Sequence, residues 1–448
     1  MKKLFQYILM AVAVVVTASC SNELDEALQP ANNGTLQFVV SDFPMFGESI
    51  QTRVIGTQDE GKTAWENGDQ IIITLTSERF GEQTTAITYD GTNWGTEVSL
   101  SYLENEIPTV SAVYAPCYEV TVEGVKQLRS GMQLGMCEYL EADCEIQNGT
   151  INISFADAFR TYSRLRIVGL ANQTLTVTTT DFTPAGATEV ATAAYTLTTD
   201  NNGNAFLYGV FAEGATVSVK QGDVTLTDYT FTEATEATYG YALDARPAID
   251  GTLGGKATAE ESDIIALMEQ LKEYVDNGIT TIIVTGAEPA IIDMDLWINT
   301  AIGEAIYRLS GSDYYDENNP YNGKIDLILQ DVTEIVDQEF YAAFALNSIT
   351  LPKVTKIGDM AFQGCYYLKQ LTFGSVLTEV NEAGGVMFAL VGKEVDGCNL
   401  FINCGQMKEN SVPTPDLTTN TWKFKYTNEF KSITLTHTGD CDECKALQ

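Results

Sequence analysis

The sequence predicts a mainly β N-terminal region, made of two β-sandwiches, followed by an α+β solenoid of short repeats. Between residues 35 and 247, short apolar runs rich in Val, Ile, Thr and Tyr alternate with turn residues. Residues 247–255 are rich in Pro and Gly, which is typical of a domain boundary. From Leu327 onward, apolar residues recur every 22 positions, and a fixed period of this length is typical of a solenoid.

Composition limits the classes of function. The 448 residues are enough for about three domains. With 25 basic and 61 acidic residues, the net charge is −36, which excludes a general nucleic-acid binder because phosphate contacts need a basic surface. His437 is the single histidine, so no site can use two imidazoles of this chain. We therefore expect no catalytic residues, no metal and no cofactor, with paired carboxylates among the 61 acids as an open alternative.

The first 19 residues have the pattern of an export signal. Lys2 and Lys3 precede an apolar run at residues 9–16, and two small residues then precede Cys20. This segment resembles a bacterial lipoprotein signal peptide, although Thr17 stands where the family usually has Leu. The resemblance implies a lipid on Cys20 and an outer-membrane anchor, because more than one acyl chain anchors stably. An ordinary secretory signal with an accidental cysteine is the alternative.

Residues 20–34 form an acidic tether, with Glu23, Asp25 and Glu26 close to the expected anchor. The tether is similar to that of surface-exported lipoproteins of Gram-negative anaerobes, which implies exposure on the cell surface. A merely solvated linker explains the same composition.

Two β-sandwiches are expected at residues 35–146 and 147–247, with a seam near 145–150. The runs at residues 36–40, 70–75 and 151–155 are examples of the expected strands. Asp90-Gly91 and Asn148-Gly149 supply the positive φ that tight hairpins require.

Three segments carry a resemblance to fimbrillin-like domains. They are Arg53 with its flanking residues, Trp65-Glu66-Asn67-Gly68-Asp69-Gln70-Ile71, and Ala112-Val113-Tyr114-Ala115-Pro116. The resemblance implies two transthyretin-like sandwiches, although a His common in the family is missing near Phe155. In related pilins a protease cuts after an Arg that ends the first strand, so it also implies possible processing at Arg53. Trp65 itself is expected to be a core anchor.

The last third begins with a predicted amphipathic helix. Thr258 and Glu261 form a capping-box pattern as N-cap and N3. Apolar residues then follow at helical spacing until Asn277-Gly278, which is a typical end. We expect this helix to cap one end of the repeats.

Apolar residues recur at one fixed interval in the last third of the chain. Three positions recur three times at a spacing of 22 residues: Leu327, Ile349 and Leu371; Leu329, Leu351 and Phe373; Val332, Val354 and Val376. Each unit is predicted to be a strand (349–352), a turn (356–358) and a short helical return (360–365), with the register slipping by one after Leu377. The pattern is closely similar to the BspA-like leucine-rich repeat. The domain should span 258–437, with strands at 281–284, 399–402 and 432–435 at its ends and a tail at 438–448.

Other candidate sites have structural explanations. Pairing among the cysteines other than Cys20 stays open, and Cys365 is expected to be a core residue. Cys441 and Cys444 are expected to form a local disulfide or to stay as thiols. The loop Asp313–Asn319 could bind calcium but lacks EF-hand spacing, so a solvated loop is favoured. Its tyrosines could stack on sugars or pack on their own domain.

The sequence thus predicts a non-catalytic adhesin, lipid-anchored in the outer membrane and exposed on the cell surface. It would bind a protein or glycan ligand on another cell or matrix through its repeats. One alternative is a fimbrial anchor or tip subunit that joins other subunits by donor-strand exchange. A second is a surface glycan-binding lipoprotein, for which the loop between Tyr314 and Tyr321 is the only indication.

Overall fold

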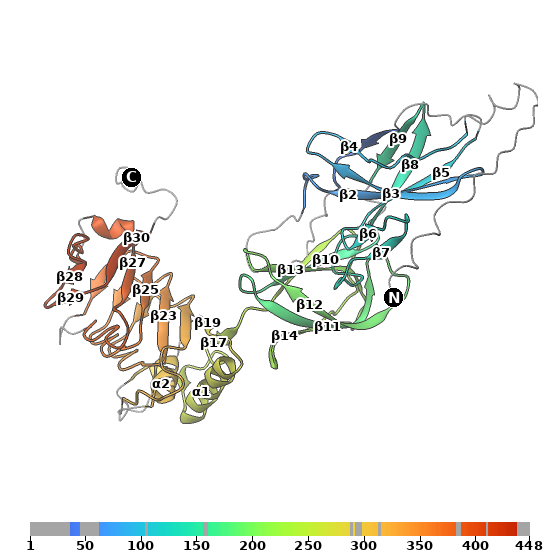
Figure 1. Cartoon of the computed structure of the whole chain (residues 1–448). Helices are drawn as coiled ribbons and strands as arrows, with labels where there is room; N and C mark the ends of the chain where they lie inside the picture. The colour runs from blue at the N-terminus through green and yellow to red at the C-terminus, as the bar shows by residue number, and fades with distance from the viewer. Residues whose placement is uncertain are drawn as a thin grey trace, which may run out of the picture.

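The computed structural model describes three units in series along the chain (Figure 1): a barrel, a sheet and a repeat domain. The described residues are 36–44, 62–103, 106–155, 160–286, 290–291, 298–311, 315–381, 387–408 and 411–436. Several predicted features lie outside them: the signal, Cys20, the tether, Arg53, His437, Cys441 and Cys444. The expectation of a mainly β region followed by an α+β repeat region is confirmed.

The first unit is a closed barrel with the strand order β1-β4-β3-β2-β5-β8-β9. Its strands are β1 (Gln37–Val40), β2 (Gln70–Ser77), β3 (Gly81–Tyr89), β4 (Trp94–Gly95), β5 (Thr109–Tyr114), β8 (Leu140–Gln147) and β9 (Thr150–Ser154). β1 closes the barrel by pairing in parallel with β9 and antiparallel with β4. The alternating sequence pattern does not specify this closure, and β4, with two residues, pairs with β3 only at Thr88 and Tyr89.

Trp65 is partly buried and packs against the core of the barrel, which agrees with its predicted anchoring role. Its ring lies 4.8 Å from that of Phe43 and 5.1 Å from that of Tyr114, both in edge-to-face geometry. The Trp65 Nε1 donates a hydrogen bond of 2.8 Å to the carbonyl of Ser41, just beyond β1. The Trp motif therefore holds the first strand against the rest of the barrel.

The predicted seam at residues 145–150 is wrong. It falls inside the β8–β9 hairpin, where Asn148 and Gly149 adopt φ values of 51° and 75° as the turn. Because Ile151 and Ile153 of β9 are buried in the barrel, the hairpin cannot be divided between two units. The boundary instead lies between Ser154 and Ser163.

The second unit is a seven-stranded sheet in the order β15-β14-β11-β13-β10-β16, with β12 paired to β11. Its strands are β10 (Ser163–Val168), β11 (Thr174–Pro184), β12 (Ala191–Thr198), β13 (Asn204–Phe211), β14 (Thr216–Gln221), β15 (Val224–Thr230) and β16 (Gly240–Asp244). Phe211 stacks between Phe182 and Phe231 at centroid distances of 4.3 and 4.6 Å. These rings fill the core of the unit.

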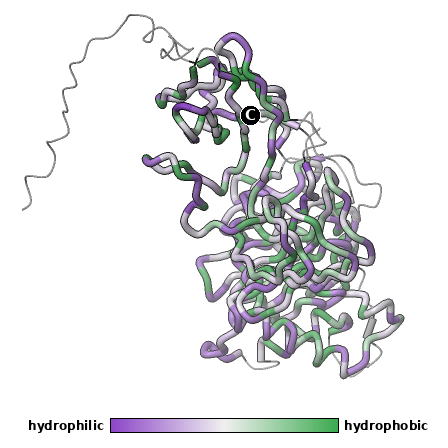
Figure 2. Tube along the Cα trace, turned by 90° about the vertical axis from the view of Figure 1, so that its right-hand side faces the viewer, coloured by the Kyte–Doolittle hydropathy of each residue, from purple (hydrophilic) through white to green (hydrophobic). Residues whose placement is uncertain are grey.

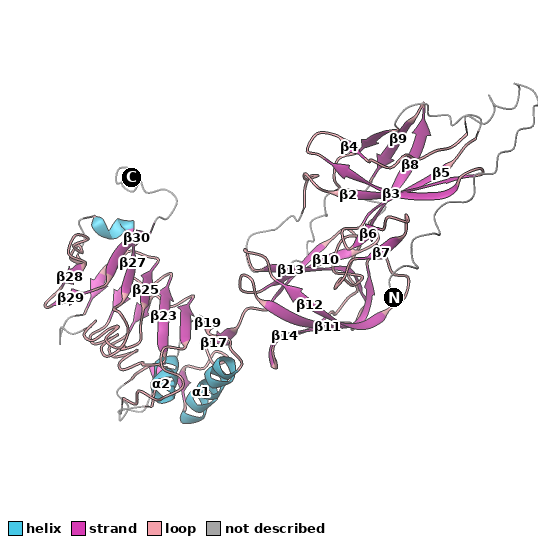
Figure 3. Ribbon diagram, viewed as in Figure 1, coloured by secondary structure: helices cyan, strands magenta, loops and turns pink. Residues whose placement is uncertain are grey.

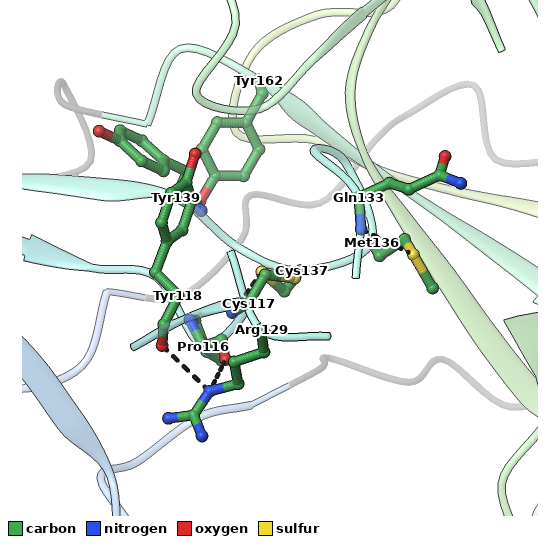
Figure 4. Close-up of a disulfide and its surroundings, with 9 residues drawn as sticks. All are labelled: Pro116, Cys117, Tyr118, Arg129, Gln133, Met136, Cys137, Tyr139 and Tyr162. Atoms are coloured by element: carbon green, nitrogen blue, oxygen red, sulfur yellow. Dashed lines mark hydrogen bonds between the residues drawn. A yellow bond between two sulfur atoms is a disulfide. The ribbon is translucent and has the colours of Figure 1, made fainter. Parts of the chain in front are cut away.

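Residues 115–139 lie between β5 and β8 of the barrel and contact the second unit, where the Tyr208 N–H donates to the Gly135 carbonyl at 2.8 Å. They carry the hairpin β6 (Tyr118–Val120) and β7 (Lys126–Leu128), and a disulfide joins Cys117 to Cys137 at its base (Figure 4). The Arg129 Nε donates to the carbonyls of Pro116 and Tyr118 beside this disulfide. One cysteine pairing that the sequence left open is thereby assigned.

A buried ion pair lies at the same junction. The Arg160 guanidinium is 3.2 Å from the Glu138 carboxylate, and both side chains are almost fully buried. Glu138 precedes β8 of the barrel and Arg160 precedes β10 of the second unit, so the pair joins the two units. Tyr162 contributes further, because its hydroxyl accepts a hydrogen bond of 3.1 Å from the backbone of Tyr139 (Figure 4).

The repeat domain is built on a seven-stranded parallel sheet in the order β17-β19-β21-β23-β25-β27-β30. The strands are β17 (Ala248–Asp250), β19 (Thr281–Thr285), β21 (Ile325–Leu329), β23 (Leu346–Leu351), β25 (Gln370–Phe373), β27 (Asn399–Asn403) and β30 (Ser432–Thr436). The predicted linker therefore contains β17, which pairs in parallel with β19. The expected end strands at 281–284, 399–402 and 432–435 are confirmed.

The 22-residue spacing sets the register of the sheet. Leu327 is paired with Ile349, and Ile349 with Leu371. All three are fully buried in one core that extends through the domain. The strict spacing ends between Phe373 and Leu377, earlier than predicted. Leu351 pairs with Phe373 at 22 residues, but the buried counterpart of Val354 is Leu377 at 23 residues, whereas Val376 is only partly buried.

The expected helical return is wrong. Residues 359–364 form consecutive turns, because Met360 and Gly364 adopt φ values of 53° and 79° and interrupt any helix. The predicted turn at 356–358 contains β24 (Lys356–Ile357), the middle strand of a second parallel sheet with β22 (Glu334–Ile335) and β26 (Glu379–Val380). Each of these repeat units thus contributes one strand to each of two parallel sheets.

Two helices cover the beginning of the repeat sheet (Figure 3). α1 (Glu261–Asp276) begins two residues later than predicted, because Glu260 and Asp263 form its capping box and Thr258 belongs to a short strand instead. It ends at Asn277-Gly278, as predicted. α2 (Ala301–Leu309) was not predicted; its N-cap Thr300 accepts a hydrogen bond from Gly303, and Arg308 joins it to Glu261 of α1.

The remaining short elements lie at the margins of the domain. They are β18 (Thr258–Ala259), β20 (Ala290–Ile291), the 3-10 helix Cys404–Met407, β28 (Thr421–Lys423) and β29 (Thr427–Glu429). Hydrophobic and hydrophilic residues alternate along the coloured trace (Figure 2), and within the described chain no helix has the length and hydrophobicity to span a bilayer.

Candidate binding face of the repeat domain

The parallel sheet has one buried face and one outer face. Along each strand the side chains alternate, so residues between the buried positions point away from the core. We call the outer face the surface formed by these residues on β21 to β30. They are Asp326, Ile328, Ser348, Thr350, Gln370, Thr372, Asn399, Phe401, Ser432 and Thr434.

The strand register arranges the outer face in two rows. Asp326, Ser348 and Gln370 are successive partners in one row, which continues through Asn399 to Ser432. The other row runs from Ile328 through two threonines to Phe401 and Thr434 in the same pairing. One row is thus wholly polar, and the other combines methyl, hydroxyl and aromatic groups.

Hydrogen bonds fix side chains in the polar row. The Asp326 carboxylate accepts from the Ser348 hydroxyl at 2.6 Å and from the Asn347 amide at 2.7 Å. At the other end, the Ser432 hydroxyl donates to the Asn399 side chain at 2.8 Å. Because these bonds join neighbouring strands, the row is ordered before any ligand arrives, and less conformational entropy would be lost on binding.

The outer face combines polar and apolar side chains. Asp326 is the only ionisable side chain in the two rows as defined, and its carboxylate is engaged by Ser348 and Asn347. Hydroxyl and amide groups beside Ile328 and Phe401 can together contact the polar and apolar parts of a large ligand.

The predicted aromatic loop packs on its own domain. The ring of Tyr315 lies 5.3 Å from Phe344 and 5.2 Å from Tyr366, and its hydroxyl is 3.0 Å from that of Tyr367. This hydrogen bond raises the pKa of Tyr315. Tyr321 bonds Asp276 of α1 through its hydroxyl. The packing interpretation is therefore confirmed for these two tyrosines.

The acidic part of that loop is a turn in the structure. Asp313 and Tyr314 lie outside the described residues, and the carboxylate of Asp316 accepts from the backbone of Asn318 at 2.9 Å. Across the described ranges, no cluster of three or more His, Cys, Asp or Glu side chains is arranged to hold a metal ion.

Cys365 occupies the core, as predicted. Its side chain is fully buried, its sulfur lies 3.0 Å from the Phe340 carbonyl, and burial raises the pKa of its thiol. Cys144, Cys398 and Cys404 are also free. None of these thiols lies on the outer face.

Sequence reasoning missed the outer face, although its signal was present. Thr350 lies between Ile349 and Leu351, and Thr372 lies between Leu371 and Phe373, at the same period as the buried residues. Strand alternation alone would have assigned both to the opposite face.

Parallel strands at a fixed spacing define a repeat protein, and a family model agrees. Residues 329–384 match the BspA type leucine rich repeat region, a model of six copies. The match covers β23 and β25, where the 22-residue register is strictest. Among curated proteins, no sequence matches the chain.

Two solved structures resemble part of the chain. One is a Bacteroides fragilis protein provisionally described as a cell adhesion protein, with 12% identity over 47% of this chain and 92% of that one, at a TM-score of 0.23. The other is a mutant of the shaft pilin SpaA from Lactobacillus rhamnosus GG, with 11% identity over 48% and 98% and a TM-score of 0.16. These TM-scores are too low to support an inference about fold or function.

Proposed function

We propose that this chain is a non-catalytic cell-surface adhesin that binds a protein or glycan on another cell or matrix through the outer face. The main support for this proposal is the BspA-type repeat region. Five strands of the repeat domain place their outward side chains in two continuous rows. Extended faces of this kind are the binding surfaces of repeat proteins.

The two N-terminal units would act as a stalk. The barrel and the repeat domain lie at opposite ends of the described chain, with the second unit between them (Figure 1). The disulfide at Cys117 and the buried pair of Glu138 with Arg160 favour a fixed barrel junction. At the other junction, Val224 of β15 is buried in the core of the repeat domain. In this proposal Cys20 carries the lipid, and the tether leads to the stalk outside the outer membrane.

A glycan and matrix-protein array tests the proposal. The chain from Ser21 onward contains every described residue and would be applied as the parent and as Thr350→Arg. Thr350 lies in the middle of the outer face, so the proposal expects at least one ligand that the parent binds and the variant loses. Failure of the parent to bind any component, or equal binding by both proteins, would count against it.

A fimbrial anchor or tip subunit is a second candidate, favoured by the position of β1. This strand closes the barrel and precedes Arg53 in the chain, so cleavage after Arg53 would remove the strand that pairs with β9. Protein purified from its native cell would then begin at residue 54. A chain that begins at Cys20 would exclude this processing.

The glycan-binding lipoprotein rests on a weaker observation. Tyr315 exposes 38% of its surface beside Tyr366 and Tyr367. If these rings held a sugar, Tyr315→Ala would abolish glycan binding on the same array while Thr350→Arg would not. The opposite pattern favours the outer face.

A further inference from the structure

A groove of about 970 Å³ lies on the barrel, distant in sequence from the repeat domain. Its walls come from β3, from residues 95–100, and from the turn of the β6–β7 hairpin at residues 120–124. Its size is within the range of ligand-binding clefts in proteins.

One wall of the groove is a strand edge. The backbone N–H of Tyr89 donates to Asp69, and hydrogen-bonded pairs alternate in an antiparallel ladder. The odd-numbered residues of β3 therefore direct their backbone groups toward β2, and the even-numbered residues direct theirs to the opposite edge. β4 pairs with that edge only at Thr88 and Tyr89.

The rest of this edge is unpaired. Glu82, Thr84 and Ala86 all line the groove, and in the described part of the chain no strand pairs with their outward N–H and C=O groups. Unpaired groups at every second residue are a template for another strand. Natural proteins usually cover such an edge, so its exposure along a groove indicates a use.

Side chains, rather than backbone, span the gap beyond β3. The Gln83 amide exchanges two hydrogen bonds with the backbone of Ser101, at 2.7 and 3.0 Å, and the hydroxyls of Thr85 and Thr96 are 3.0 Å apart. On the third wall, a Cβ on Gly124 would lie 3.3 Å from the Thr84 carbonyl oxygen. A glycine there lets the hairpin turn approach the edge without a side chain filling the groove.

The chemistry of the lining defines the occupant. Three lining residues are ionisable, all of them acidic: Glu82, Glu97 and Glu123. No lining residue is aromatic, so a sugar has no ring on which to stack. The apolar Val98 and Val122 are exposed at 56% and 102%.

The terminal segments of the chain and a second copy are poor sources of this occupant. Residues 21–34 carry three acids and no base, residues 437–448 carry three acids and one lysine, and a second copy brings its own net charge of −36. Each would be repelled by the carboxylates of the groove.

We propose that the groove is a strand-addition site, in which an extended, basic segment of a partner protein pairs with β3 at Glu82, Thr84 and Ala86. Main-chain hydrogen bonds would give affinity, and lysine or arginine at alternate positions would meet the three glutamates. This site is independent of the outer face of the repeat domain.

The test uses a seven-residue peptide that alternates lysine with threonine or valine, with both ends blocked. Amide hydrogen exchange is followed by NMR on the chain from Ser21 onward. Without peptide, the amides of Glu82, Thr84 and Ala86 should exchange fast and those of Gln83 and Thr85 slowly. Saturating peptide should slow the first group and leave the second unchanged. Absence of binding, or binding without this alternation, would overturn the proposal.

Two controls separate backbone pairing from charge. N-methylation of the peptide nitrogens that face β3 should weaken binding by at least about tenfold, whereas methylation of the intervening nitrogens should not. A double variant with Glu82→Gln and Glu97→Gln should bind the peptide more weakly, and its binding should depend less on salt. Glu141→Gln with Glu145→Gln, exposed on β8 outside the groove, removes the same charge and should have little effect. If both pairs of substitutions weakened peptide binding equally, the binding would be general electrostatic attraction, and the proposal of a specific site would be contradicted.

Discussion

The rings of Phe340 and Phe362 stack 5.7 Å apart at an interplanar angle of 13°, and the two residues are 22 positions apart in the chain. Phe388 continues the stack at 5.8 Å and 8°. Phe362 is therefore enclosed by equivalent residues of the units before and after it, which makes it the most direct reporter of repeat packing.

Phe362→Ala should lower the free energy of unfolding of the repeat domain by about 3–5 kcal/mol, because a buried ring is lost and a cavity remains. Limited proteolysis and thermal melting should find the repeats loosened while the N-terminal units stay folded. Lys356→Ala is the control: Lys356 is exposed and makes only an exposed ion pair with Glu379, so a change within about ±0.5 kcal/mol is expected. If Lys356→Ala destabilised the repeats and Phe362→Ala did not, the packing of Phe362 would be refuted.

Glu138 predicts a pH dependence of the barrel junction. Burial raises the pKa of Glu138 above its ordinary value, although Arg160 acts in the opposite direction. Between the two values the folded chain holds a proton that the unfolded chain releases, so the free energy of unfolding should fall as pH rises. Glu138→Gln should remove this slope in unfolding experiments between about pH 4 and 8. If the parent instead gains stability over the variant as pH rises, the ion pair outweighs burial.

Cys365 should resist alkylation in the folded chain. Its thiol is fully buried and its pKa is raised, so little thiolate forms and reagent cannot reach it. Mass spectrometry after iodoacetamide treatment should find Cys365 labelled only in denaturant. Cys144 is the comparison, since burial and Asp143 raise its pKa to about 11 but its side chain is only half-buried. Labelling of Cys365 before Cys144 would mean that the repeat core opens.

Cys20→Ala should release the protein from membranes, because the proposed lipid is the anchor. Fractionation of cells that express the parent and the variant is the measurement. An intact variant that stays in the membrane fraction would exclude Cys20 as the anchor. For the parent, protease added to whole cells should remove the protein if it is on the surface, whereas protection until the outer membrane is broken would place it in the periplasm.

Residue spacing predicted the repeat register because one fixed period places Leu327, Ile349 and Leu371 side by side in neighbouring strands. Residue spacing did not predict the backbone conformation of the return segment. Met360 adopts a positive φ that no side-chain pattern reveals, and this φ excludes the expected helix. Local capping was also misjudged, because Thr258 and Glu260 both suit an N-cap and only the strand at 258–259 distinguishes them.

The N-terminal units were harder to predict because their contacts are distant in sequence. Alternation indicates strands, but the pairing of β1 with β9 joins Gln37 to Thr150, and no local signal specifies it. The pairing of Cys117 with Cys137 and of Glu138 with Arg160 likewise depends on the folded junction. The outer face was predictable from the sequence, because the residues between the buried positions of each strand must point to the opposite face.

Whether the outer face binds the ligand is best measured by the adhesion of displayed protein. Beads carrying the parent, Thr350→Arg or Thr333→Arg would be measured for attachment to a surface coated with the strongest array ligand. Thr333 is the exposed loop residue before β22, so the control introduces the same side chain and charge away from the strands of the outer face. We expect Thr350→Arg to lose attachment and Thr333→Arg to retain it. Equal attachment by the parent and Thr350→Arg would show that the outer face does not bind the ligand.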